Sequence, residues 1–119
     1  MSQVLIVEDY DDARMMVEMI LEDAGYHVLL ASDGVEGVTL ARTHHPDAIL
    51  MDIFMPGIDG IEATRQLKAD PVTADVPVIA YTAKPASVRD GEELFAAVCS
   101  TPCPPDELLK IIGEFAPLK

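Results

Sequence analysis

Three carboxylates and one hydroxyl stand at the ends of short apolar runs in this chain of 119 residues. Glu8 and Asp9 follow QVLIV, Asp52 follows AILM, and Thr82 lies near the end of VPVIAYTA. If the carboxylates gather they repel one another, because two like charges about 4 Å apart interact by roughly 4 kcal/mol at an effective dielectric near 20. A proton or a cation relieves that repulsion, and a hard divalent ion such as Mg2+ prefers oxygen ligands.

A carboxylate beside Mg2+ is suited to phosphoryl chemistry. The ion neutralises phosphate oxygens, and a carboxylate that attacks a phosphoryl group becomes an acyl phosphate. Asp52 is the central candidate for this attack, and the Thr82 hydroxyl could donate to a phosphoryl oxygen. A helix cap is the simpler explanation for such an aspartate, but Asp59 and Gly60 already stand before the next helical pattern.

These residues are far apart in the sequence, and the elements between them predict how they meet. Apolar runs typical of buried strands alternate with segments of helical periodicity. Gly91 weakens the fourth helical segment by about 1 kcal/mol. The expected strands occupy 3–7, 27–31, 48–51, 76–83 and 98–100, and the expected helices occupy 11–25, 34–46, 60–70, 87–97 and 105–115.

Five strand–helix units predict an α/β fold in a single domain, residues 1–119. We expect a flavodoxin-like, doubly wound sheet of five parallel strands in the order 2-1-3-4-5, with five helices. Ligands of such sheets bind beyond the carboxyl ends of the strands where the strand order reverses, here between the first and third strands. Glu8, Asp9 and Asp52 should therefore converge, with Thr82 facing the same cleft and Thr101 ending the fifth strand.

The composition restricts the partners that this chain could have. Its formal net charge of -13 disfavours binding to nucleic acid phosphates and to anionic lipid. No apolar run approaches the roughly 20 residues of a membrane span. No signal peptide is evident before Gln3, so we expect a cytoplasmic location and no membrane partner. Cys99 and Cys103 are expected to be reduced, with a redox role as the alternative.

Four motifs together resemble those of bacterial response-regulator receiver domains, which are CheY-like, over essentially the whole chain. They are VLIVED at 4–9, ILMDIFMPGIDG at 49–60, VIAYTA at 78–83 and TPCPPDELL at 101–109. The resemblance implies a two-component signalling module rather than an enzyme. Such a module accepts a phosphoryl group from a histidine kinase or a histidine phosphotransfer protein, with Mg2+ as the cofactor.

The resemblance also implies a role for each matching residue. Asp52 would be the phosphoacceptor and a metal ligand. Asp9 would bind Mg2+ directly, Glu8 mainly through water, and the backbone carbonyl of Phe54 would be a further ligand. Thr82 would be the switch hydroxyl that moves toward the phosphoryl group.

The chain departs from the family pattern around its fifth strand. Thr101 stands where the family carries a lysine that pairs with the aspartyl carboxylate and then with the phosphoryl group, and threonine supplies no charge. Pro102 would follow a cis peptide bond. Val98 stands at the aromatic switch position, and the stretch between Thr82 and Thr101 is a few residues shorter than in the family. Lys84 could replace the missing cation, although most loop lysines are simply solvated.

These departures leave two other functions open. A receiver-like module that signals through binding, without phosphorylation, is consistent with Thr101 and Val98. A Mg2+-dependent phosphatase or other hydrolase is disfavoured, because no separate general base and no P-loop signature is evident. On the first expected helix, Met16 fits core packing as well as it fits docking of the phosphodonor, which this helix often assists in the family.

Overall fold

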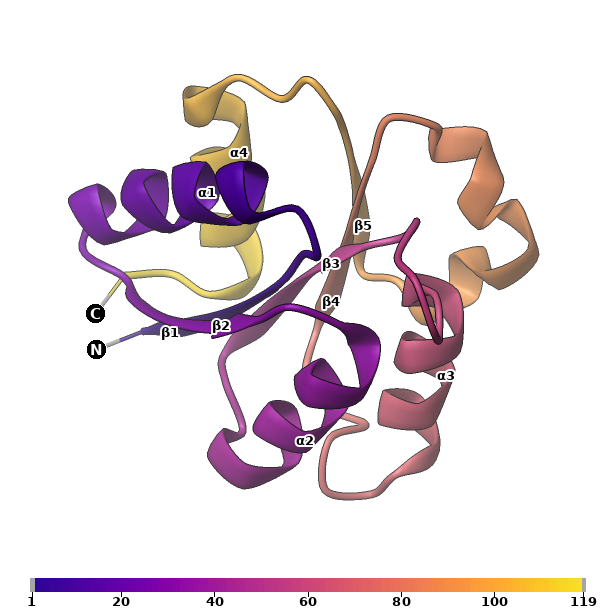
Figure 1. The fold of residues 1–119 in the computed structure, drawn as a ribbon. Helices are drawn as coiled ribbons and strands as arrows, with labels where there is room; N and C mark the ends of the chain where they lie inside the picture. Colours follow the sequence, from indigo (N-terminus) through magenta and orange to yellow (C-terminus); the bar gives the residue numbers. More distant parts are fainter. Residues whose placement is uncertain (1, 119) are drawn as a thin grey trace.

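The computed structural model describes residues 2–118, except for the side chain at position 90. Strands and helices alternate along the chain (Figure 1). No helix among the described residues is long and apolar enough to cross a bilayer. The strands are β1 (Gln3–Val7), β2 (His27–Ala31), β3 (Ala48–Asp52), β4 (Val78–Thr82) and β5 (Ala97–Ser100). The helices are α1 (Asp11–Ala24), α2 (Gly34–His44), α3 (Gly60–Ala69), the 3-10 helix η1 (Pro85–Leu94) and α4 (Pro105–Phe115).

The five strands form one parallel sheet in the order β2-β1-β3-β4-β5, as predicted. β1 therefore lies between β2 and β3, and the strand order reverses between β1 and β3. In the register of this pair, Val7 lies opposite Met51. Residues that directly follow β1 and β3 thus reach the same edge of the sheet.

Helices cover both faces of the sheet, which explains why β1, β3 and β4 are apolar along nearly their whole length. Figure 1 shows α1 and α4 on one face, and α2 and α3 on the other. On the first face Ile6 and Leu50 pack with Leu21 of α1 and Leu108 of α4. On the second face the core comprises Leu5, Val7, Ile49, Met51 and Val78 from the strands, with Ala41 of α2 and Ala63 and Leu67 of α3.

Residues with known capping preferences stand at the ends of the helices. The Asp59 carboxylate accepts a hydrogen bond from the Glu62 N–H at 2.8 Å and caps α3. Asp33 caps α2 in the same way, and each such cap contributes about 1 kcal/mol. Gly25 ends α1 with φ at 107°, a left-handed conformation that glycine adopts without steric cost. Pro105 lies in the first turn of α4, where its missing N–H is not needed.

The prediction of an α-helix at 87–97 is wrong, and the described residues contain four α-helices rather than five. The chain instead forms η1, a 3-10 helix that ends three residues before β5 begins at Ala97. Gly91 has φ -130° and ψ 21°, which are not helical angles, and it divides the segment into two parts. The glycine and the early start of β5 leave too short a stretch for a stable α-helix.

The core-facing side of α1 is narrower than the sequence suggests. Val17 and Leu21 are buried, whereas Met16 is 58% exposed. Met15 and Met19 are exposed as well. Core packing therefore does not explain Met16, and we refer to these three residues as the methionine patch.

Candidate metal centre

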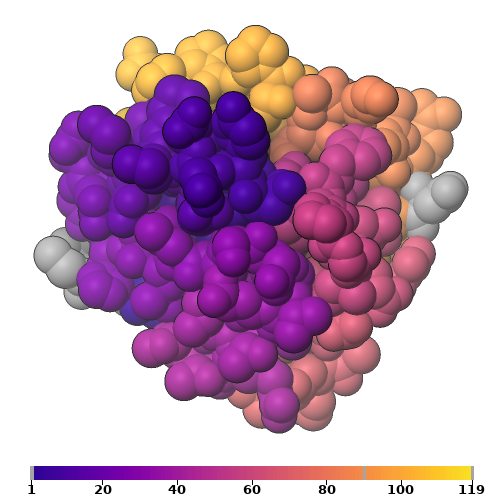
Figure 2. Space-filling model, viewed as in Figure 1, coloured from indigo at the N-terminus to yellow at the C-terminus, as the bar shows by residue number. Residues whose placement is uncertain are grey.

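Three carboxylates converge beyond the carboxyl ends of β1 and β3. Because Val7 lies opposite Met51, the residues that follow them, Glu8 and Asp52, reach the same edge. One oxygen each of Glu8, Asp9 and Asp52 lies within 4.8 Å of the others. Figure 2 shows the segment after β1, in indigo, meeting the segment after β3, in magenta, on one face of the molecule. The sheet topology thus assembles the carboxylate cluster from two distant parts of the chain.

The three carboxylates of the cluster differ in their exposure to solvent. Glu8 retains only 9% of its surface exposed, Asp52 is partly buried, and Asp9 is exposed. A cavity of about 380 Å3, lined by residues 9–12, opens beside it at the start of α1. A small ligand can therefore approach from the side of Asp9, while the protein shields Glu8 from water.

Burial and mutual repulsion perturb the protonation of this cluster. Burial, with added contributions from Asp52 and Asp9, raises the pKa of Glu8 to about 8. Burial and the charge of Asp9 also raise the pKa of Asp52, although hydrogen bonds from Glu8 and from the Phe54 N–H oppose that rise. Both shifts have the same direction, so the folded protein favours a proton on the Glu8–Asp52 pair when no cation is bound.

Arg14 supports the cluster from α1, a role that was not predicted from the sequence. Its Nη1 donates to the backbone carbonyl oxygen of Glu8 at 2.9 Å, and its Nη2 pairs with Asp11. The Tyr10 N–H donates to Oε2 of Glu8 at 3.1 Å. The spacing of three residues between Asp11 and Arg14 was the available signal, because such pairs meet on one helix face.

Gly60 allows α3 to begin directly against the end of β3. A Cβ atom at this position would lie 2.1 Å from the carbonyl oxygen of Asp52, which no side chain tolerates. The Gly60 N–H also donates to the carbonyl oxygen of Ile53 at 2.9 Å. The sequence identified Gly60 as part of a helix start, but this close approach depends on tertiary packing.

Thr82 and Thr101 are joined at the ends of β4 and β5. The Thr101 N–H donates to the carbonyl oxygen of Thr82 at 2.9 Å. The Thr82 side chain is buried, and its hydroxyl oxygen accepts from the Lys84 N–H at 3.1 Å. Thr101 lies one residue beyond the end of β5, and its peptide bond to Pro102 is cis.

The Lys84 ammonium lies over an aromatic ring next to the cluster. Its Nζ atom is 5.6 Å from the centroid of the Phe54 ring, a cation–π arrangement. The Phe54 side chain is itself 55% exposed. Lys84 therefore lies near the rim of the site, with its ammonium over Phe54.

The chemistry of the cluster fits a hard divalent cation. All three side chains offer carboxylate oxygens, which Mg2+ prefers. Within residues 2–118, the ion pairs involve other acidic groups, namely Asp11, Asp70 and Asp75. Among the described residues no ion pair joins the three carboxylates to a side-chain cation, and a bound ion would take the place of the proton on the Glu8–Asp52 pair.

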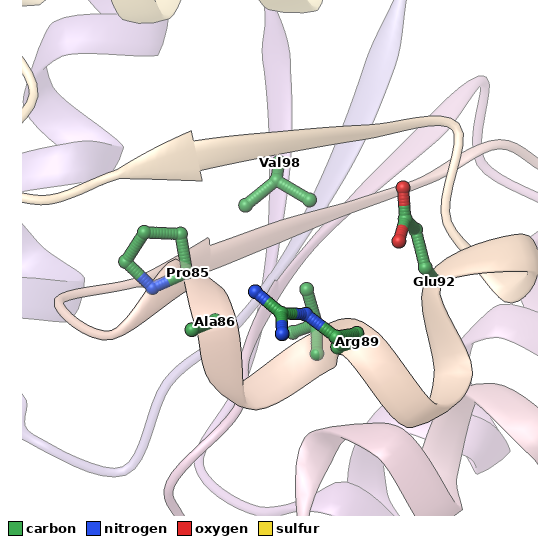
Figure 3. A pocket seen from close by; sticks show the side chains of 6 residues that line it. Pro85, Ala86, Arg89, Glu92 and Val98 are labelled. Carbon is green, nitrogen blue, oxygen red and sulfur yellow. The ribbon is translucent and has the colours of Figure 1, made fainter.

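A separate hollow of about 330 Å3 lies between η1 and β5. Figure 3 shows Val98 of β5 directed toward Ala86 and Arg89 of η1 across this hollow. It shares no residue with the carboxylate cluster. Its remaining lining residues are Pro85, Val88 and Glu92.

Comparison with known proteins gives a consistent result. Residues 4–111 match the family described as the response regulator receiver domain. Protein PilH of Pseudomonas aeruginosa is 46% identical over 84 residues, which are 71% of this chain and 69% of PilH. The polar-differentiation response regulator DivK of Brucella ovis is 44% identical over 82 residues, which are 69% of this chain and 67% of DivK.

Solved structures resemble this fold closely. Chemotaxis protein CheY4 of Vibrio cholerae superposes with a TM-score of 0.90 at 30% identity, covering 97% of this chain and 98% of that one. The receiver domain of a sensor histidine kinase from Pseudomonas aeruginosa superposes with a TM-score of 0.85 at 32% identity, covering 96% of both chains, and a magnesium ion is coordinated in its active-site cleft. The chain belongs to the response regulator receiver domain family, a regulatory domain of two-component signalling systems.

Proposed function

We propose that residues 1–119 form one receiver domain that accepts a phosphoryl group on Asp52 in a Mg2+-dependent reaction. The observation that carries this proposal is the carboxylate cluster of Glu8, Asp9 and Asp52, whose oxygens lie within 4.8 Å of one another. The cluster stands at the reversal point of the strand order, where sheets of this kind bind ligands. Membership of the receiver family and the magnesium site of one structural neighbour support the same assignment.

Each carboxylate has a distinct part in the proposed site. Asp9, Asp52 and the backbone carbonyl of Phe54 would hold Mg2+, and Glu8 would act mainly through water. When bound, the ion neutralises charge on the phosphoryl oxygens. Glu8 loses its proton as the ion binds, and its high pKa makes that exchange depend on pH.

Phosphoryl transfer would form one bond and break another. A carboxylate oxygen of Asp52 attacks the phosphorus of a phosphohistidine, the P–N bond breaks, and the electron pair of that bond returns to the imidazole nitrogen. The Thr82 hydroxyl oxygen already accepts from the Lys84 N–H, so its own hydrogen is available to a phosphoryl oxygen. Thr82 would then serve as the switch residue, because the new hydrogen bond favours a hydroxyl that points toward Asp52.

The threonine at position 101 predicts slower or weaker phosphorylation than a lysine would give. A phosphoryl group adds a charge of roughly -1.5 to -2, and Thr101 offers only a neutral hydrogen bond. Lys84 is a candidate for the replacement charge because it follows Thr82 by two residues, but its ammonium lies over the Phe54 ring. Mg2+ would therefore have to balance most of the added charge.

We expect the phosphodonor to be a histidine kinase or a histidine phosphotransfer protein. The methionine patch on α1 lies on the helix that begins directly beside the cluster, and it offers an exposed, adaptable apolar surface for such a partner. The net charge of -13 favours partners with basic surfaces and disfavours nucleic acid.

The proposal can be tested with a small phosphodonor. The protein is incubated with phosphoramidate and Mg2+, and its intact mass is followed with time. We expect a gain of one phosphoryl group that disappears in Asp52→Asn and when the divalent ion is chelated. Asp23→Asn is the matched control, since Asp23 is an exposed carboxylate at the opposite end of α1 from the cluster. Equal labelling of the wild type and Asp52→Asn would refute Asp52 as the acceptor.

A second candidate function is a binding module that works without phosphorylation. Two features favour this function. Thr101 stands where the family pattern has a lysine. Val98 stands where the pattern has an aromatic switch residue, and a hollow lies beside it. This function predicts that a partner binds wild type and Asp52→Asn with the same affinity. A large difference in affinity between the two proteins would count against it.

A further inference from the structure

The two cysteines of the chain lie against each other. The sulfur atoms of Cys99 and Cys103 are 2.6 Å apart, and both residues are free thiols. The sulfurs of a disulfide are about 2.05 Å apart, so a small movement separates this pair from a covalent bond. Cys99 is only 1% exposed, whereas Cys103 is partly exposed and accessible to a small reagent.

The strand β5 positions Cys99, and the turn that follows it positions Cys103. Side chains alternate along β5. Val98 faces the hollow beside η1 (Figure 3), so Cys99 faces the opposite side of the sheet. There Cys99 belongs to the buried core with Leu108 and Ile112 of α4, and Cys103 packs against the same core. The turn from Ser100 to Pro102 therefore returns the chain to a fixed place beside Cys99.

We propose that Cys99 and Cys103 form a reversible intramolecular disulfide, which makes the CSTPC turn a redox modification site. The oxidant is a low-molecular-weight disulfide such as glutathione disulfide. The modification requires neither Mg2+ nor phosphoryl transfer, and it does not depend on the function proposed above.

The different exposure of the two thiols sets the order of the chemistry. The Cys103 thiolate attacks one sulfur of glutathione disulfide, the S–S bond of the reagent breaks, and glutathione leaves as a thiolate. Cys99 then gives up its proton as its sulfur attacks the Cys103 sulfur, and the second glutathione leaves and takes up a proton. Both protein protons end on the two glutathione molecules, so two cysteines are oxidised and one disulfide reagent is reduced.

Burial of Cys99 fits its part as the second thiol. Burial in the core and the adjacent Cys103 raise the pKa of Cys99 to about 12. The thiol is thus protonated and shielded from the reagent. It reacts only with a neighbour already within reach, and that neighbour is Cys103.

The modification connects to the acidic site through Thr101. A disulfide would enclose Thr101 and Pro102 in a covalent ring, and the Thr101 N–H donates to the carbonyl oxygen of Thr82. Closing the ring restricts the motion of this turn. The oxidised protein should therefore hold the ends of β4 and β5 together more firmly than the reduced protein does.

Thiol chemistry and mass spectrometry test the proposal. The full chain is incubated with glutathione disulfide, then its free thiols are counted and its intact mass is measured. We expect the wild type to lose both thiols and two hydrogen atoms in mass, with no bound glutathione. Cys99→Ala should retain one glutathione on Cys103, and Cys103→Ala should remain unmodified because Cys99 is shielded. Circular dichroism establishes that each variant is folded.

Two results would overturn the proposal. One is a wild-type protein that keeps both thiols, and the other is a wild-type protein that accumulates a stable glutathione adduct. Hydrogen exchange tests the connection to the acidic site. The Thr101 amide should exchange more slowly in the oxidised protein than in the reduced protein, and equal rates would refute that connection.

Discussion

Replacement of Glu8 by glutamine should change how the stability of the protein depends on pH. In the folded state burial raises the pKa of Glu8 from 4.5 to about 8. Between these two values the folded protein keeps a proton that the unfolded chain has lost. Stability therefore falls as the pH rises through this window, because the folded state binds more protons there.

The expected size follows from proton linkage. One proton corresponds to about 1.4 kcal/mol per pH unit. Glutamine resembles the protonated acid and does not titrate, so the stability of the wild type relative to Glu8→Gln should fall by up to that slope between about pH 5 and pH 8. Asp52 shares the proton with Glu8. Summed over this pH window, the expected loss of stability is a few kcal/mol. That is a large part of the roughly 5–15 kcal/mol that stabilises a typical domain.

Urea denaturation followed by far-ultraviolet circular dichroism provides the measurement, since the chain has no tryptophan. Free energies of unfolding are measured for both proteins at several pH values with a chelator present. In parallel samples without chelator, a Mg2+ concentration of 100 times the Kd at pH 8 should stabilise the wild type by about 2.7 kcal/mol at pH 8. The same concentration should stabilise it by less at pH 5, where protons compete with the ion. A difference between wild type and Glu8→Gln that is flat, or that increases with pH, would refute the shared proton.

Three further predictions concern the neighbours of the cluster. Thr101→Lys should increase the rate of phosphorylation by small phosphodonors about tenfold, equivalent to about 1.4 kcal/mol of barrier, because it supplies the missing charge; a slower reaction would argue against that role for position 101. Lys84→Ala should leave the rate unchanged, because the ammonium lies over Phe54 and an exposed loop lysine is mainly solvated. A clear loss of rate would instead show that Lys84 reaches the phosphoryl group. Gly60→Ala should destabilise the fold by roughly 1–3 kcal/mol or more, measured by urea denaturation, because the new Cβ would meet the Asp52 carbonyl oxygen at 2.1 Å. The matched control is Gly113→Ala in α4, where the nearest atom would be 3.9 Å away, and this change should be neutral or stabilising by about 0.5–1 kcal/mol.

The sheet could be predicted from the sequence because its strands carry their signal locally. Runs such as AILM are apolar throughout, as strands covered on both faces must be. The meeting of Glu8 with Asp52 was also predictable, since parallel topology brings the carboxyl ends of neighbouring strands to one edge. The strand boundaries in the structure differ from the predicted ones by a residue or two. For example, β5 begins at Ala97, one residue before the predicted start.

The parts that the sequence did not predict depend on tertiary packing. The segment that became η1 has helical periodicity, but Gly91 and the early start of β5 decide its form. Met16 has the spacing of a core residue, yet α1 packs through Val17 and Leu21 and leaves it exposed. The close approach of Gly60 to Asp52 joins two elements in space, and no local pattern encodes it.

Titration calorimetry with Mg2+ tests the central claim most directly, namely that Asp9 and Asp52 share one divalent ion. Wild type, Asp9→Asn, Asp52→Asn and the control Asp23→Asn are titrated under the same conditions near pH 8. We expect one ion bound per wild-type chain, similar binding by Asp23→Asn, and strongly weakened binding by the other two variants. Absence of binding to the wild type, or equal affinities for all four proteins, would contradict it.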